Sequence, residues 1–124
     1  MVTTDFIKYV SLLYDKVRFP VQVFEPTGKI VYVNEAFTIL WGYHLDELKE
    51  YSLFNDSVLK ENNALQKISE VINGKSYTAI DYYEDSLLRS RDYAIPILRT
   101  NIFTLKDEDD LYIVMYHEDQ TEIL

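Results

Sequence analysis

The first twenty positions of the chain show the hydrophobic spacing of an amphipathic helix. Phe6, Val10, Leu13 and Val17 follow one another at intervals of four, three and four residues. This spacing places the four side chains along one side of a helix. Pro20 predicts that the helix has ended before it, because proline cannot continue a helix. We expect this stripe to be buried against the rest of the chain or against a second copy of itself.

Two short runs rich in β-branched residues follow, at residues 21–25 and 30–33. The turn at residues 26–29 has the sequence Pro-Thr-Gly-Lys, so the two runs predict a β-hairpin. Asn34 comes next and predicts the N-cap of a helix. Gly42 predicts the end of that helix, because glycine adopts the left-handed conformation at little cost.

The middle of the chain predicts further helices. A short helical stretch is expected at residues 44–50, and a clearer helix at about 61–73. Asn73 and Gly74 predict the end of the second helix. The segment at residues 51–57 is ambiguous.

Three more runs with strand character occupy residues 77–83, 93–105 and 111–116, and a polar turn at 106–110 joins the last two. The order is therefore a helix, two strands, several short helices and three strands. Strands grouped at both ends of a helical middle predict an α+β fold, with a five-stranded antiparallel sheet and short helices on one face.

Composition narrows the functional classes. The 124-residue chain carries 12 Lys+Arg against 21 Asp+Glu, a net charge of -9. This negative charge disfavours binding to nucleic acids and to anionic membranes. The chain has no cysteine, no apolar run approaching the roughly 20 residues of a membrane span, and no signal-peptide pattern. We therefore expect one cytoplasmic domain without a membrane span.

No catalytic or metal-binding constellation is visible in the sequence. The two histidines, His44 and His117, lie far apart in the chain. A metal site needs a cluster of ligands, and a nucleophile needs a base that a third group orients. We expect both histidines to lie on the surface or at a strand end, and we expect neither a metal site nor an enzyme.

Several short motifs occur in a specific order and spacing: the hairpin with Asn34 at its end, and then Asn34-Glu35-Ala36-Phe37, Trp41-Gly42-Tyr43, Glu47-Leu48 and Asp119-Gln120-Thr121. Together they resemble the PAS family over about residues 19–122. The chain departs from the family pattern at His44, where a small capping hydroxyl is favoured, and at Glu50, where glycine is frequent. The resemblance implies a PAS domain at residues 19–124, preceded by an N-terminal helix at 1–18.

The resemblance also bears on cofactors. Family members that bind haem commonly use a histidine on the helix before the third strand, and residues 61–73 contain none. Light-sensing flavin members need a cysteine for their photoadduct, and this chain has none. Haem and a cysteinyl-flavin adduct are therefore disfavoured, whereas a non-covalent flavin, a small organic ligand or no ligand at all remain open.

Large apolar side chains are expected between the sheet and its helices, where family members have either a ligand pocket or a filled core. The candidates are Phe24, Tyr32, Phe37, Trp41, Ile68, Ile72, Ile97, Phe103 and Val114.

In function, the chain resembles the signal-input module of a larger signalling protein, for which a sensor histidine kinase is our leading expectation. The motif containing Asp119 and Thr121 commonly couples the last strand of a PAS domain to an effector, which we expect after residue 124. One alternative effector is a diguanylate cyclase of the GGDEF type. Another alternative is a ligand-free interaction module, in which the stripe of Phe6, Val10, Leu13 and Val17 forms a homodimer.

Overall fold

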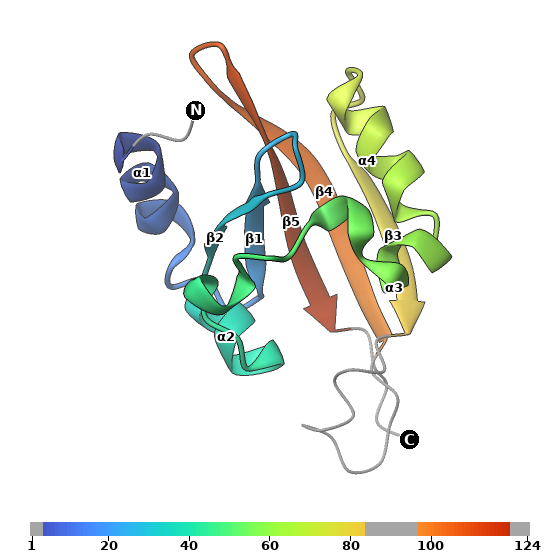
Figure 1. Cartoon of the computed structure of the whole chain (residues 1–124), viewed down its shortest axis with the longest axis horizontal. Helices are drawn as coiled ribbons and strands as arrows, with labels where there is room; N and C mark the ends of the chain where they lie inside the picture. Colours follow the sequence, from blue (N-terminus) through green and yellow to red (C-terminus); the bar gives the residue numbers. More distant parts are fainter. Residues whose placement is uncertain (1–3, 84–96, 120–124) are drawn as a thin grey trace.

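The computed structural model describes residues 4–83 and 97–119 (Figure 1). An N-terminal helix precedes a β-hairpin, and a set of short helices leads to three longer strands. The helices are α1 (Thr4–Tyr14), α2 (Glu35–Trp41), α3 (Ser57–Glu61) and α4 (Ala64–Ile72), with the 3₁₀ helices η1 (Leu45–Leu48) and η2 (Leu53–Asn55). The strands are β1 (Val21–Phe24), β2 (Ile30–Val33), β3 (Thr78–Tyr83), β4 (Ile97–Asp107) and β5 (Asp110–Asp119). No described helix is long and apolar enough to cross a membrane.

The strands form one five-stranded sheet in the order β2-β1-β5-β4-β3. All neighbouring strands are antiparallel, which confirms the predicted α+β class. The last described strand, β5, lies in the centre and pairs with the first, so that Val23 lies opposite Val114.

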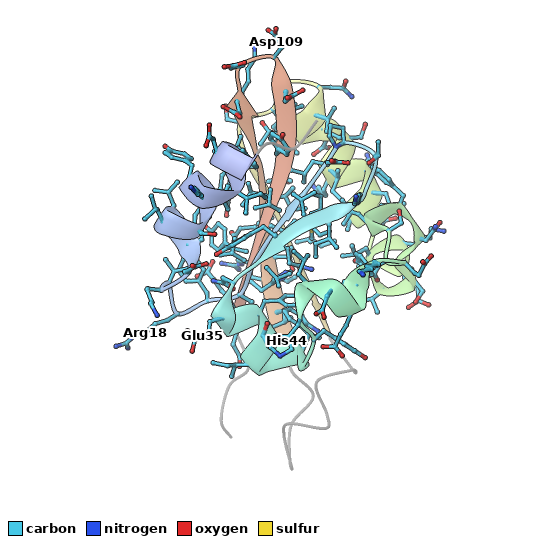
Figure 2. All side chains as sticks on the ribbon, turned by 60° about the vertical axis from the view of Figure 1, so that its left-hand side comes forward. Arg18, Glu35, His44 and Asp109 are labelled. Atoms are coloured by element: carbon cyan, nitrogen blue, oxygen red, sulfur yellow. The ribbon has the colours of Figure 1, made fainter. Side chains whose placement is uncertain are left out.

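The hairpin between β4 and β5 is tighter than the sequence predicts. Asp107 pairs with Asp110, which leaves a turn of Glu108 and Asp109 in place of the expected five-residue turn. Glu108 has a φ of 55°, the left-handed conformation typical of such tight turns. Asp107 and Asp110 are therefore the ends of the two strands, and Asp109 stands at the tip of the hairpin (Figure 2).

Alternation along the strands gives the sheet two different faces. The face toward α3 and α4 carries Phe24, Ile102 and Ile113, which form a buried cluster with Leu59 and Ile68 of these helices. This cluster is the main core of the domain, and it fixes the helical layer that surrounds the candidate site.

Helix α1 covers the opposite face of the sheet. The Phe6 ring stacks on Tyr112 with ring centroids 3.9 Å apart, and Val10 is fully buried in the same cluster with Val23 and Val114. Figure 1 shows α1 beside the β1–β2 side of the sheet. The apolar stripe predicted from the sequence is therefore covered, at Phe6 and Val10, by the chain's own sheet.

Asn34 joins α1, β1 and α2. Its Oδ1 accepts hydrogen bonds from the backbone N–H of Val21 at 2.9 Å and of Phe37 at 3.0 Å. Its Nδ2 donates to the carbonyl oxygens of Tyr14 and Phe19, each at 3.0 Å. The predicted N-cap is confirmed, and the same buried side chain also holds the segment between α1 and β1.

The helical middle follows the sequence prediction in outline. The helix expected at 61–73 is α4, and Asn63, with a φ of 60°, separates it from the short α3. The stretch expected at 44–50 contains the 3₁₀ helix η1. Gly42 ends α2 in the predicted left-handed conformation, with a φ of 82°.

Candidate ligand-binding site

A cavity of about 260 Å³ lies between the sheet and the helices α2, η1 and α3. Its apolar wall includes Ile30, Phe37, Trp41, Leu48, Leu59 and Met115. Its polar wall consists of Gln22, Tyr51, Asp56 and His117. Cavities that are largely apolar and carry a few polar groups are the usual form of small-molecule sites.

Strand alternation places the floor of this cavity. Met115 and His117 on β5, and Gln22 on β1, point to the same face of the sheet, because Gln22 lies opposite Met115 in the β1–β5 ladder. One side wall comes from α2, where Phe37 and Trp41 are four residues apart and therefore share a face. Their ring centroids are 5.0 Å apart.

His117 is the centre of a buried hydrogen-bond network. Its Nε2 lies 2.6 Å from Gln22 Oε1, and its Nδ1 lies 2.7 Å from Thr100 Oγ1. A carbonyl oxygen can only accept, so Nε2 carries the proton and Nδ1 accepts from the Thr100 hydroxyl. The network thus crosses the adjacent strands β1, β5 and β4.

Burial keeps His117 uncharged. Its side chain is almost completely enclosed, and desolvation lowers its pKa from 6.5 to about 3. The Trp41 ring meets it edge-on, with centroids 4.9 Å apart. At neutral pH the floor of the cavity is therefore a neutral imidazole that a tryptophan covers.

Asp56 also lines the cavity. Its Oδ1 accepts from the backbone N–H groups of Val58 and Leu59, at 3.0 and 3.2 Å, and so caps α3. Its other oxygen accepts from the Tyr51 hydroxyl at 2.7 Å. Both oxygens are therefore occupied by bonds within the protein, and this carboxylate acts as a structural cap.

Solved structures share the fold that holds this site. The PAS domain of BvgS from Bordetella pertussis has a TM-score of 0.71 at 16% identity, with 96% of this chain and 89% of that chain covered. The PAS domain of the fruit-fly ELK potassium channel has a TM-score of 0.66 at 16% identity, with coverage of 94% and 98%. A sensory box sensor histidine kinase from Vibrio cholerae has a TM-score of 0.62 at 14% identity, with coverage of 93% and 92%. The chain has the PAS fold.

The PAS resemblance seen in the sequence is thus confirmed at the level of the fold. No protein-family model matches the chain. No curated protein sequence matches it either. At identities this low, the structural likeness fixes the fold, and the function has to be argued from the site itself.

The candidate pocket residues separate into three groups in the structure. Phe37 and Trp41 line the cavity. Phe24, Ile68 and Ile72 pack in the neighbouring core cluster, and Ile97 begins β4. The remaining three, Tyr32, Phe103 and Val114, lie on the face that α1 covers. These three do not lie between the sheet and helices α2–α4, because a side chain one position along a strand points to the opposite face.

The histidines correct one expectation from the sequence. His44 is exposed, as expected, and Figure 2 shows it at the end of the molecule opposite Asp109. His117 was expected at the surface or at a strand end; it is near the end of β5, but it is buried in the network described above. Among the described residues, no group of metal-ligating side chains lies together.

The structure also gives the positions of the candidate dimerisation residues and of Asp119, one of the two candidate coupling residues. Phe6 and Val10 are buried against the sheet, Val17 is partly buried beside them, and Leu13 is 46% exposed. Asp119 is the last residue of β5 and lies opposite Leu98 of β4. Thr121 lies outside the described residues.

The polar residues of the site were not predicted from the sequence. Gln22, Thr100 and His117 each stand one position from a residue of strong strand propensity, and each points to the buried face. A strict period of two, counted from Phe24 on β1 and from Met115 on β5, would have assigned Gln22 and His117 to the inside. Tyr51 and Asp56 fall in the segment that gives no periodic signal.

Proposed function

We propose that this PAS domain is the signal-input module of a larger signal-transduction protein, and that the occupant of the cavity is its signal. The observation that supports the proposal is the position of the cavity on β5. Met115 and His117 form part of its wall, and Asp119 follows them on the same strand. A change in the wall therefore acts on the strand that ends at Asp119, the first residue of the motif expected to couple to an effector.

The network around His117 supports a mechanism. Trp41 touches the imidazole from α2, and the imidazole is bonded to Gln22 of β1 and Thr100 of β4. An occupant that displaces Trp41 or competes for Gln22 alters the contacts of three adjacent strands. Such an occupant biases the domain between two states only by binding one of them more tightly. The groups in the wall favour binding, and we propose no catalytic step.

For the effector we propose a histidine kinase, as in the larger signalling proteins named by several similar structures. The alternative is a diguanylate cyclase of the GGDEF type. The same fold in a potassium channel shows that the fold alone does not select an effector. The acidic charge and the lack of cysteine support a cytoplasmic location.

A chimeric kinase tests the signalling proposal. The domain replaces the PAS domain of a sensor histidine kinase, and autophosphorylation is measured with Val58, which lines the cavity, changed to Phe. Because the larger ring occupies the cavity, we expect a kinase rate that differs several-fold from the parent chimera. Glu61→Gln on the exposed side of α3 is the matched control and should leave the rate unchanged. Equal rates for all three chimeras would contradict the proposal.

Homodimerisation is a second candidate function, and the exposed side of α1 supports it. Tyr9, Leu12 and Leu13 are 58%, 87% and 46% exposed, and they lie at positions that share a helix face. We propose that this patch, and not the buried Phe6 and Val10, contacts a second copy. Light scattering should show a dimer that Leu12→Glu converts to a monomer, whereas Glu61→Gln on the exposed side of α3 should leave the dimer intact. A monomeric parent chain removes this candidate.

A further inference from the structure

The amide of Gln22 has one half that the protein uses and one half that it leaves open. Its Oε1 accepts from His117 Nε2, and the structure gives its Nε2 no acceptor within the described part of the chain. Gln22 as a whole is only 8% exposed. A donor that no protein group accepts from is free to bond a ligand, so its neighbourhood shows where a partner is expected.

The open half of this amide faces the cavity. In the described part of the chain, every fully enclosed side-chain nitrogen or oxygen has a hydrogen-bond partner. The Gln22 nitrogen has none and therefore borders open space, and the open space that Gln22 lines is the cavity. His117 holds the amide in this orientation, since its Nε2–H engages the carbonyl end.

The other polar groups of the wall exclude a charged occupant. No lysine or arginine is among the cavity-lining residues that the structure describes, and burial keeps His117 neutral. A bound anion would thus be desolvated without a counter-charge. A cation would need Asp56, but both its oxygens already accept from Val58, Leu59 and Tyr51.

The size and shape of the cavity narrow the class of ligand further. A volume of 260 Å³ corresponds to about nine molecules of liquid water, which suits a ligand of about ten non-hydrogen atoms. Phe37, Trp41, Tyr43 and Tyr51 contribute rings to the wall. Aromatic rings pack well against other rings in offset or edge-to-face arrangements, so a flat occupant gains most from this wall.

We propose that the cavity binds an uncharged, aromatic molecule of about ten non-hydrogen atoms, whose hydrogen-bond acceptor accepts a hydrogen bond from Nε2 of the Gln22 amide. This inference rests on the proposed function only in assuming that the cavity has an occupant. It adds the chemistry of recognition: the Gln22 amide donates to an acceptor on the ligand, and the wall offers a charged ligand no free partner of opposite charge.

Four small probes of similar size test this chemistry on the full chain. Acetophenone has the aromatic ring and a carbonyl acceptor, and α-methylstyrene has the same shape with a methylene group in place of the oxygen. Benzoate adds a negative charge, and benzylammonium adds a positive one. Binding is measured by ¹H–¹⁵N NMR titration, in which the side-chain amide signals of Gln22 report directly on the site.

We expect acetophenone to bind at least about ten-fold more tightly than α-methylstyrene, since the hydrocarbon leaves the amide unpaired. Acetophenone should also shift the Gln22 amide signals, and neither charged probe should do so. Equal binding of acetophenone and α-methylstyrene, tighter binding of benzoate or benzylammonium, or no shift by acetophenone up to its solubility limit would each overturn the proposal.

Two variants test separately whether the Gln22 amide sets the preference for acetophenone and whether the probes bind in the cavity. Gln22→Met keeps the length of the side chain and removes the donor, so it should erase the preference for acetophenone while α-methylstyrene still binds. Val58→Phe fills the cavity and should reduce the binding of both probes. A preference that persists in Gln22→Met overturns the role of the amide. If the Met variant is poorly folded, the shift of the Gln22 amide signals in the parent chain still tests that role, and the Val58 variant tests the location of binding.

The NMR titrations and the chimeric kinase can fail independently, so failure of the ligand proposal is distinguishable from failure of the signalling proposal. If acetophenone binds with the expected preference but Val58→Phe leaves the chimeric kinase unchanged, the ligand chemistry holds and the signalling proposal fails. If Val58→Phe changes the kinase rate but no probe shifts Gln22, the signalling proposal holds and the ligand class is wrong.

Discussion

His117 Nε2 donates a hydrogen bond to Gln22 Oε1 across 2.6 Å, although the two residues are 95 positions apart in the chain. The bond ties the first strand of the sheet to the last. The imidazole is neutral at this site, because desolvation by burial lowers its pKa to about 3. The pair therefore links the stability of the fold to pH.

The first prediction concerns acid stability. Below the ordinary pKa of 6.5 the unfolded chain binds a proton at His117, and the folded chain does so only near pH 3. Stability from the neutral imidazole is thus fully present above pH 6.5 and falls by about 1.4 kcal/mol per pH unit below it. We expect the parent to lose about 2 kcal/mol more than His117→Phe between pH 7 and pH 5, measured by urea denaturation. Equal losses would contradict the assignment, because the other acids titrate alike in both proteins.

The second prediction concerns Asn34. Replacement by Ala removes its four hydrogen bonds and leaves the backbone groups of Val21, Tyr14 and Phe19 without this partner, so we expect a loss of about 3 kcal/mol. Asn34→Asp keeps the cap acceptor but sets a carboxylate against two carbonyl oxygens. We expect it to speed hydrogen exchange in α1 more than in α4. An Asp variant that is as stable as the parent would show that the two Nδ2 bonds contribute little.

The third prediction concerns Gly28. A Cβ added there would lie 2.7 Å from Phe54 Cδ2 and 2.9 Å from Ser52 Oγ, and the residue has a φ of 95°. Gly74 also has a positive φ, of 116°, but no atom lies within 4 Å of its added Cβ. We expect Gly74→Ala to cost about 1 kcal/mol from the backbone alone, and Gly28→Ala about 1–2 kcal/mol more. Thermal denaturation compares the two, and equal costs would refute the steric contribution of Phe54.

The fourth prediction concerns the contact between α1 and β2. The Tyr32 hydroxyl donates to the Asp15 carboxylate just after α1, and burial followed by this bond raises the pKa of Tyr32. Tyr32→Phe should cost about 1 kcal/mol, since the carboxylate is partly solvated. Tyr9→Phe on the exposed side of α1 should stay within about 0.5 kcal/mol of the parent.

The hydrogen bond between Tyr32 and Asp15 also predicts how the stability of the fold changes at alkaline pH. A raised pKa favours the neutral phenol in the folded state, so this stabilisation is present below pH 10 and is lost as the pH rises further. Denaturation in urea between pH 9 and pH 11 should therefore show a steeper decline for the parent than for Tyr32→Phe. Parallel declines would place the ionisation elsewhere.

Local signals were sufficient to predict most of the fold. The spacing of Phe6 and Val10, the cap at Asn34 and the left-handed glycine at Gly42 each depend on neighbours within a few residues, and the structure has all of them. The hairpin turn at Glu108 and Asp109 was predicted too long, because acidic residues at strand ends resemble a loop in sequence.

The candidate site could be predicted only in part, since its polar groups become partners through the sheet. Gln22, Thr100 and His117 lie on strands that become neighbours only when β5 enters between β1 and β4. Nothing local to His117 distinguishes a buried imidazole from an exposed one at a strand end. Phe37 and Trp41 were predicted because their helical spacing is a local feature.

The central position of β5 has a consequence for synthesis of the chain on the ribosome. The sheet order puts β1 and β4 on its two sides, so the β1–β2 and β3–β4 pairs share no partner strand before residues 110–119 emerge. Until then both inner strand edges are open, and open edges are sites of aberrant association between chains. A nascent chain arrested before residue 110 should therefore bind chaperones, and release from them should follow the appearance of β5.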